Sequence, residues 1–156
     1  MAVDKNLFLY DLAVVAIMKD EDPYVKEWID YHLLAGVDHF YIYDNDSTPE
    51  FKKILQPYID ANIVTYIRFP GKARQFEAYT QSLKNKFDCR YMTFLDGDEF
   101  IYPLSDKSIM EVVNEIMDKN PLAGSLSIYW QFFGSSGQEK ADYSKGVLER
   151  FLYNAK

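Results

Sequence analysis

Apolar residues follow two alternating patterns along the chain. Short, nearly continuous apolar stretches alternate with longer segments in which apolar residues recur every three or four positions. The first pattern predicts buried strands and the second predicts amphipathic helices. We expect strands at residues 12–18, 39–43, 63–69, 91–95 and 126–133, and helices at about 23–35, 49–57, 74–86 and 109–117. This alternation is typical of βαβ units, so the predicted fold class is α/β, a mostly parallel sheet flanked by helices in one domain, residues 1–156.

Several residues predict where the helices begin and end. Asp22 and Pro23 fit the N-cap and first position of the first helix. Pro57 is expected to end or kink the second helix, because proline lacks a backbone N–H. Ser108 opens a capping-box pattern before the fourth helix. The residues expected on the buried faces of the first and third helices are Val25, Trp28, Ile29, His32 and Leu33, and Phe76, Tyr79 and Leu83.

The most informative stretch is the apolar run 91–95, which leads directly into Asp96-Gly97-Asp98. A buried strand cannot hold unpaired carboxylates, so we expect it to end at about Leu95, with the acids at its carboxyl edge. Ligands bind at that edge in open α/β sheets. Two carboxylates around a glycine can converge on one hard cation, and Gly97 would allow a tight turn. The alternative interpretation is an ordinary polar turn after a strand.

Charged residues also follow the other predicted strands. Asp20 and Glu21 follow the first strand, and Asp44 and Asp46 follow the second. These acids share one sheet edge with Asp96 and Asp98 if the strands are parallel. Lys72 and Arg74 follow the third strand and could meet phosphate oxygens, although a solvated loop explains them equally well.

Composition narrows the classes of function. The chain of 156 residues has a net charge of −7, which argues against a general nucleic-acid-binding protein. Its single cysteine, Cys89, excludes an intrachain disulfide and fits a reducing compartment. No apolar run reaches membrane-spanning length, and the N-terminal segment does not fit a signal peptide. We expect a cytoplasmic protein, or one peripheral to the cytoplasmic face of a membrane.

Two sets of aromatic and histidine residues have a structural and a functional interpretation. Trp28 and His32 lie on the apolar face of the first predicted helix, which favours a core role. Trp130 and Phe133 precede a Gly/Ser loop and could form a sugar-stacking wall, whereas a buried strand explains the same pattern.

A set of short motifs occurs in a fixed order along the chain: Lys19-Asp20-Glu21, Glu27-Trp28, Tyr31-His32, residues 36–45, Gln75, Ala78-Tyr79, Phe94 to Phe100, Trp130, Phe133 to Gly137 and Glu149-Arg150-Phe151. This ordered set resembles the GT-A-fold glycosyltransferases of the family-2-like and family-92 kind. The resemblance extends from about Leu12 to Phe151 and implies a GT-A-like, Rossmann-like sheet.

The resemblance implies transfer of a sugar from a nucleotide-diphosphate-sugar donor, with UDP-sugar as the first candidate, to a hydroxyl of a carbohydrate or glycoconjugate acceptor. It further implies inversion and a Mn²⁺ or Mg²⁺ ion held by Asp96 and Asp98. The implied donor-binding residues are Lys19, Glu21, Asp44, Asn45, Lys72, Arg74, Gln75 and Asp96. The implied acceptor-side residues are Trp130, Phe133, Gly134, Ser135 and Ser136. The implied catalytic residues are Asp96, Asp98 and, as the candidate base, Glu139, with Asp142 and Glu149 as alternatives.

Members of this fold usually continue past the fifth-strand region, so we expect a C-terminally truncated form that binds donor better than it transfers sugar. Two other functions stay open. A phosphohydrolase of the haloacid-dehalogenase type would use Asp96 as a nucleophile, but its motif usually follows the first strand. A non-catalytic module that binds nucleotide sugars or carbohydrate would fit the short C-terminus.

Overall fold

A parallel sheet lies at the centre of the computed structural model, which describes residues 7–154. Its strands are β1 (Tyr10–Met18), β2 (His39–Asp44), β3 (Val64–Arg68) and β4 (Cys89–Phe94). They lie in the order β3-β2-β1-β4, and every neighbouring pair is parallel. The predicted fold class, an α/β protein with a Rossmann-like sheet, is confirmed.

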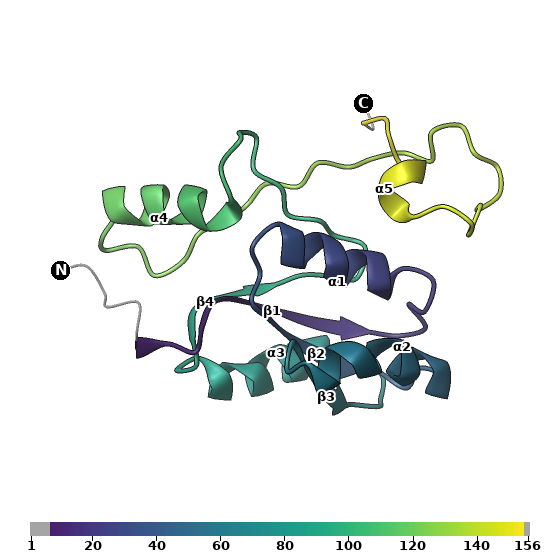
Figure 1. Ribbon diagram of the computed structural model, residues 1–156, viewed down its shortest axis with the longest axis horizontal. Coiled ribbons are helices and arrows are strands. Elements are labelled where there is room, and N and C mark those ends of the chain that lie inside the picture. The colour runs from purple at the N-terminus through teal and green to yellow at the C-terminus, as the bar shows by residue number, and fades with distance from the viewer. Residues whose placement is uncertain (1–6, 155–156) are drawn as a thin grey trace.

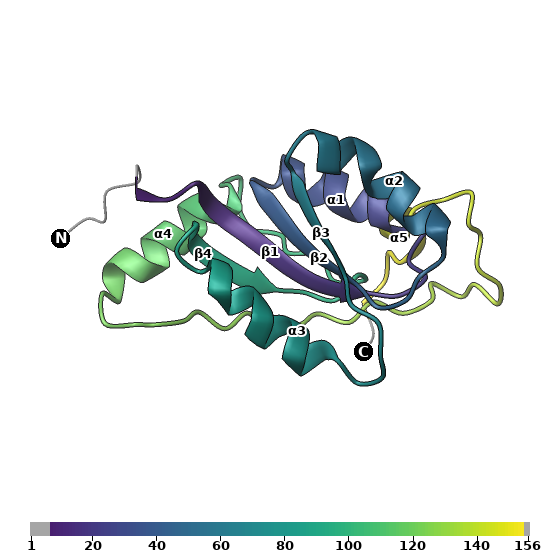
Figure 2. The same ribbon diagram turned by 90° about the horizontal axis from the view of Figure 1, so that it is seen from below.

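Helices cover both faces of the sheet, because the strands are apolar on both sides. Alternate residues of β1 point to opposite faces. One face packs with α1 (Val25–Leu34), α2 (Pro49–Asp60) and the start of α4 (Ile109–Lys119). The other face packs with α3 (Gln75–Ser82), which continues as the 3₁₀ turn η2 (Leu83–Asn85). Figure 2 shows α3 on the opposite side of the sheet from α1 and α2.

The strand order reverses beside β1. The chain moves outward from β1 to β2 and β3, and then returns through α3 to add β4 on the other side of β1. The carboxyl ends of β1 and β4 therefore form a topological switch point, the usual ligand position in open α/β sheets.

Several predicted helix boundaries are wrong. The first helix begins at Val25, not at Pro23, and the Asp22 carboxylate accepts a hydrogen bond from Thr48 Oγ1 (3.2 Å) in place of capping it. Pro57 lies inside α2, which continues to Asp60. Because Pro57 is exposed, water can reach the carbonyl that lacks its helical partner. The capping box at Ser108 is confirmed.

The buried face of α3 also differs from the prediction. Phe76 is 84% exposed and Leu83 is 47% exposed, whereas Ala78 and Ser82 are buried. The helix lies close against β1, where small side chains fit and a phenylalanine does not. The predicted buried face of α1 is confirmed, with Val25, Trp28, Ile29 and His32 all fully buried.

The predicted fifth strand, residues 126–133, is not a strand. The segment is irregular and exposed, with Ile128 58% and Tyr129 99% accessible, and its one ladder contact with the described residues 7–154 is an isolated bridge between Phe133 and Asn154. A strand needs a neighbour to satisfy its backbone, and no strand among residues 7–154 pairs with this segment. A short helix, α5 (Val147–Arg150), follows.

No helix within the described part of the chain is long and apolar enough to span a bilayer.

Candidate functional site

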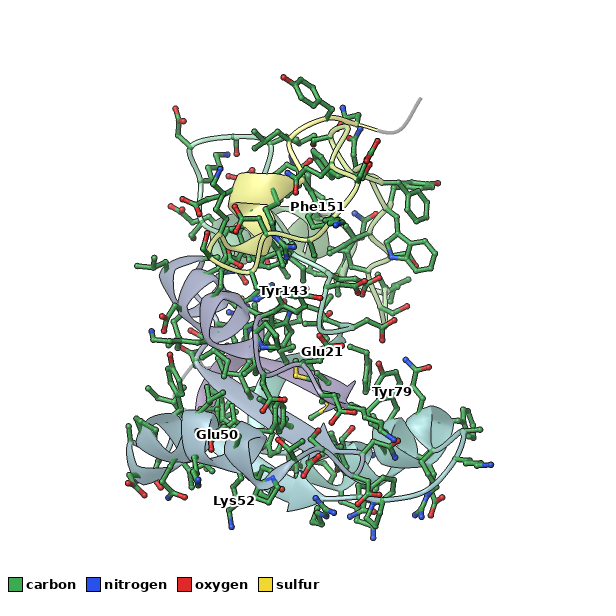
Figure 3. All side chains as sticks on the ribbon, turned by 90° about the vertical axis from the view of Figure 1, so that its right-hand side faces the viewer. Glu21, Glu50, Lys52, Tyr79, Tyr143 and Phe151 are labelled. Carbon is green, nitrogen blue, oxygen red and sulfur yellow. The ribbon has the colours of Figure 1, made fainter. Side chains whose placement is uncertain are left out.

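The acidic loops meet at the carboxyl edge of the sheet, as the parallel arrangement requires. Glu21 follows β1, Asp44 ends β2, and Asp96 and Asp98 follow β4. The last ladder bond of β4 runs from the Leu95 N–H to the Val15 carbonyl (3.1 Å), so the strand ends where the sequence predicts. Figure 3 looks onto this edge and labels Glu21 near its centre, with Tyr79 of α3 to one side.

Asp96 is held from two directions. Its Oδ1 accepts hydrogen bonds from Gln75 Nε2 (2.8 Å) and from the Tyr79 hydroxyl (3.4 Å), and Gln75 Nε2 also donates to that hydroxyl (3.0 Å). The Asp96 N–H donates to Glu99 Oε2 (3.0 Å), which closes the turn behind it. Burial, followed by the charge of Asp96, raises the pKa of Tyr79, so this hydroxyl stays protonated as a donor. These bonds leave Asp96 Oδ2 free of the α3 contacts.

Glu21 lies directly against the Asp96–Asp98 turn. A Cβ built on Gly97 would lie 3.4 Å from Glu21 Cγ and 3.5 Å from Met18 Cε, which is ordinary van der Waals distance, so these side chains pack directly against the turn. The predicted turn at Gly97 is present, closed by the Glu99 N–H donating to the Asp96 carbonyl (3.1 Å), but the φ of Gly97 is not positive, so the turn does not itself require glycine. Burial, and then the nearby charge of Asp98, raises the pKa of the Glu21 carboxyl. The edge therefore concentrates negative charge between β1 and β4.

The Asp44 carboxylate is fully occupied within the protein. It is 1% exposed and accepts hydrogen bonds from Tyr66, from Arg68 Nη1 (2.9 Å) and from the Ser47 N–H (2.8 Å). Burial opposes its ionisation, but these donors outweigh that effect and hold the pKa of Asp44 below its usual value. Asp44 therefore joins the ends of β2 and β3, and a donor-binding role for it remains a prediction.

Asn45 has a similar bridging position, because its amide donates to the carbonyls of Phe69 (2.9 Å) and Gly71 (2.8 Å). Arg74 pairs with Glu77 (2.6 Å) and lies over the Phe69 ring, so its guanidinium is already engaged. Lys19 and Lys72 are exposed at the ends of β1 and β3. Their predicted contacts with a donor remain untested.

Helix α1 fixes the segment that follows the acidic turn. Trp28 Nε1 donates to the Glu99 carbonyl (2.8 Å), and the Tyr31 hydroxyl donates to the Ile101 carbonyl (3.1 Å). His32 Nε2 accepts from the Ile101 N–H (3.3 Å). The core positions predicted for Trp28 and His32 are confirmed, as is a hydrogen-bonded role for His32, but the sequence did not indicate that their partners are Glu99 and Ile101. Their polar atoms on an otherwise apolar helix face were the available signal.

The predicted acceptor-side residues lie apart from the acidic loops in the sequence and in the bonding network. Trp130 is 75% exposed and Phe133 is 41% exposed, which excludes the buried-strand alternative for them. Ser135 and Glu139 are exposed. Within residues 7–154, Glu139 makes no hydrogen bond or ion pair with the acids at the sheet edge.

A divalent cation would find carboxylate oxygens at this edge but no complete cage. Among residues 7–154, no group of three or more His, Cys, Asp or Glu side chains could hold a metal ion by itself. The predicted ligands, Asp96 and Asp98, have the oxygen chemistry that Mg²⁺ and Mn²⁺ favour. Mg²⁺ commonly takes one or two carboxylates and completes its shell with substrate phosphates and water, and this donor set fits that pattern.

The parallel sheet, with its order reversed between β1 and β4 and with acidic loops at that reversal, defines an α/β domain of the Rossmann-like, GT-A type. Residues 15–152 match the family model of glycosyltransferase family 92, so the chain belongs to this family.

Curated relatives agree with this assignment. The chain is 25% identical over 130 residues to a glycosyltransferase family 92 protein of Ricinus communis, which covers 82% of this chain and 24% of the relative. It is 27% identical over 141 residues to a family 92 protein of Oryza sativa subsp. japonica, a match that covers 88% of this chain and 24% of the relative. It is 33% identical over 100 residues to a galactan β-1,4-galactosyltransferase of Arabidopsis thaliana, a match that covers 57% of this chain and 19% of the relative. The chain thus spans about a quarter of the length of the relatives it matches.

Proposed function

We propose that this chain is the donor-binding part of a metal-dependent glycosyltransferase, which takes a sugar from a nucleotide-diphosphate donor and transfers it, with inversion, to an acceptor hydroxyl. One observation carries the proposal. The acidic turn Asp96–Asp98 and the Glu21 loop flank the switch point between β1 and β4. Within residues 7–154, none of these three carboxylates takes part in an ion pair, so their charge is available to a cation.

Different residues at the edge would hold different parts of the sugar donor. Asp98 and the free Oδ2 of Asp96 would hold the ion, which neutralises charge on the leaving diphosphate when it is bound. Gln75 and Tyr79 fix the orientation of Asp96, so its free oxygen is pre-organised and little ordering remains on binding. Lys19 and Lys72, exposed at the same edge, would meet phosphate oxygens.

The family and the chemistry of the edge support the proposed class of donor. Two relatives are named as galactan β-1,4-galactosyltransferases, so UDP-galactose is the first UDP-sugar to test. The acceptor is then a carbohydrate hydroxyl, and exposed Trp130 offers an apolar ring face for it. Family membership argues against the phosphohydrolase alternative, whereas a module that binds without turnover remains an outcome of the test.

The test is thermal unfolding of the chain with UDP, other nucleoside diphosphates and UDP-sugars, each with and without Mn²⁺. A ligand at 100 times its Kd adds about 2.7 kcal/mol, which at this size raises Tm by roughly 5–10 °C. We expect a shift that needs both the nucleotide and Mn²⁺ and that disappears in Asp98→Asn. Asp118→Asn, on exposed α4, is the matched control and should keep the full shift.

Two results would contradict the proposal. A rise in Tm with nucleotide that does not depend on Mn²⁺ would contradict the proposed metal dependence. A chain that folds but shows no shift with any nucleotide would remove the donor site. A shift without any sugar release would instead identify the non-catalytic binding module.

A further inference from the structure

The C-terminal segment, residues 133–154, closes on itself and carries the Gly134–Gly137 loop. The Gly134 N–H donates to the Tyr153 carbonyl (2.9 Å), and the Leu152 N–H donates to Ser136 Oγ (3.0 Å). Gln138 also reaches the far side of the segment, where its amide donates to the Arg150 carbonyl (3.2 Å). The loop and α5 are thereby bonded together across the segment.

The start of α5 is tied to α1 by a single carboxylate. Glu27 accepts hydrogen bonds on its two oxygens from the N–H groups of Val147 (2.5 Å) and Leu148 (3.1 Å). These are the first N–H groups of α5, which have no partner inside the helix. Bonds from backbone N–H groups to an ionised acceptor are among the stronger hydrogen bonds in proteins. In Figure 1, α5 lies beyond the end of α1, on the same side of the sheet.

Gly146 makes this approach possible. A Cβ built at Gly146 would lie only 2.5 Å from Glu27 Cδ and would overlap its carboxylate oxygens. The backbone of Gly146, at φ −69° and ψ 172°, is one that any residue adopts. The glycine is therefore required by the closeness of Glu27 and not by its own conformation.

Arg150 completes the contact. It is only 3% exposed, and its guanidinium lies over the rings of Tyr24 (5.2 Å), Tyr143 (5.6 Å) and Phe151 (5.2 Å). Tyr24 belongs to the same β1–α1 connection as Glu21, three residues away. Figure 3 shows Tyr143 between α5 and Glu21. The attachment of α5 is thus continuous with the loop that borders the acidic edge.

We propose that Glu27 is a positioning residue that fastens α5 to α1 and so fixes the Gly134–Gly137 loop, which is bonded to the α5 segment, relative to α1. The fastening itself stands on the contacts above. Its consequence for sugar transfer rests on the proposed function, because the loop then forms the acceptor side of the site. Glu27 acts through backbone contacts and touches neither donor nor acceptor.

Amide hydrogen exchange on the whole chain tests the fastening without any ligand. In Glu27→Ala we expect exchange at Gly134 and Leu152 to rise by at least about tenfold, while exchange in β1 and β4 stays unchanged. Glu27→Gln keeps one carbonyl acceptor and should give an intermediate rise, which preserves the test if the alanine variant folds poorly. Glu50→Gln, a glutamate in the first turn of α2 paired only with exposed Lys53, is the matched control.

A double-mutant cycle separates this contact from general stability. Gly146→Ala should raise exchange at Gly134 and Leu152 as strongly as Glu27→Ala, because the new methyl group displaces the carboxylate. In the Glu27→Ala background the same change should add nothing, because the overlap is gone. Additive effects, or a matching rise in the central strands, would overturn the proposal.

The functional arm compares donor hydrolysis with transfer to an added saccharide. In Glu27→Ala we expect the Mn²⁺-dependent nucleotide shift and hydrolysis to persist, while the fraction of sugar transferred falls at least about fivefold. An unchanged transfer fraction together with raised exchange would limit Glu27 to holding α5 and overturn its part in acceptor positioning. If the wild-type chain shows no nucleotide shift, the proposed function fails, whereas the exchange cycle still decides the fastening.

Discussion

At the scale of single residues, the site depends on how each carboxylate at the sheet edge is held. Asp44 is buried and bonded by three donors, and Asp96 is held on one oxygen by α3. Glu21 lies half-buried against Gly97 and beside Asp98. The sequence predicts that these acids share an edge, because that needs only parallel strands. It does not predict which carboxylate already accepts hydrogen bonds within the protein, because the hydrogen-bond donors come from distant segments.

The first residue-scale prediction concerns the support of Asp96. Gln75→Leu removes the 2.8 Å bond to Asp96, and we expect Mn²⁺-dependent nucleotide binding to weaken about fivefold, or ~1 kcal/mol. Tyr79→Phe removes the longer 3.4 Å bond to Asp96 and the 3.0 Å bond from Gln75 to the hydroxyl, but keeps the bond from Gln75 to Asp96, and should cost about twofold. Nucleotide titration at fixed Mn²⁺ measures both. Gln56→Leu breaks an equivalent surface bond, to Asp60, and should change nothing; equal losses in all three variants would contradict this role.

The second residue-scale prediction concerns Glu21. The folded-state pKa of Glu21 is raised, so the folded protein disfavours the ionised carboxylate. The protonated form stabilises the fold, and this contribution is lost as pH rises through the folded-state pKa. Glu21→Gln should therefore raise the free energy of unfolding at pH 7 by about 1 kcal/mol without cation, or roughly 2–4 °C in Tm. The gain should shrink toward pH 4. Calorimetry measures it, and a lower Tm at pH 7 would show that Glu21 is stabilised by a partner.

At the scale of elements, the pattern of apolar residues predicts most segments but not their neighbours. The four strands and the helices α1 to α4 form close to their expected positions. Residues 126–133 have the composition of a strand, yet remain irregular, because strand formation requires a partner with free backbone groups. The face of α3 was predicted wrongly for a related reason: close packing against β1 selects Ala78 over the larger Phe76.

Substitutions at the two tryptophans test whether the cost in stability depends on the packing of the side chain and not on its place in an apolar stretch. Trp130→Phe, at a side chain 75% exposed, should change the free energy of unfolding by less than about 0.5 kcal/mol. Trp28→Phe leaves the Glu99 carbonyl without its donor inside the core and should cost about 2 kcal/mol. Urea unfolding followed by circular dichroism measures both. Equal costs would mean that residues 126–133 are packed in solution.

At the scale of the whole molecule, α1 connects the sheet, the acidic turn and the C-terminal segment. Its Trp28, Tyr31 and His32 hold residues 99–101, and its Glu27 holds α5. A change in α1 should therefore affect both residues 99–101 and α5. Buried His32 makes this connection sensitive to pH.

Acid should weaken the molecule through His32. Burial lowers its folded-state pKa from 6.5 to about 4, so the unfolded chain binds this proton more readily. A depressed histidine contributes stability that is present above pH 6.5 and lost as pH falls toward 4, by at most about 3 kcal/mol. Urea unfolding across that range measures the loss. His32→Gln, which cannot titrate, should flatten the curve; an unchanged slope would assign the loss to other groups.

The sequence by itself determined the α/β class, the parallel alternation of strands and helices, and the arrival of acidic loops at one sheet edge. These features follow from local periodicity and from the rule that parallel strands end together. Only the tertiary structure decided that Asp44 is occupied, that Asp96 is held through Gln75 and Tyr79, and that Glu27 reaches α5 across 120 residues of sequence. Each of these depends on which segments meet in space, and hydrogen-bond partners far apart in the chain leave no periodic signal in it.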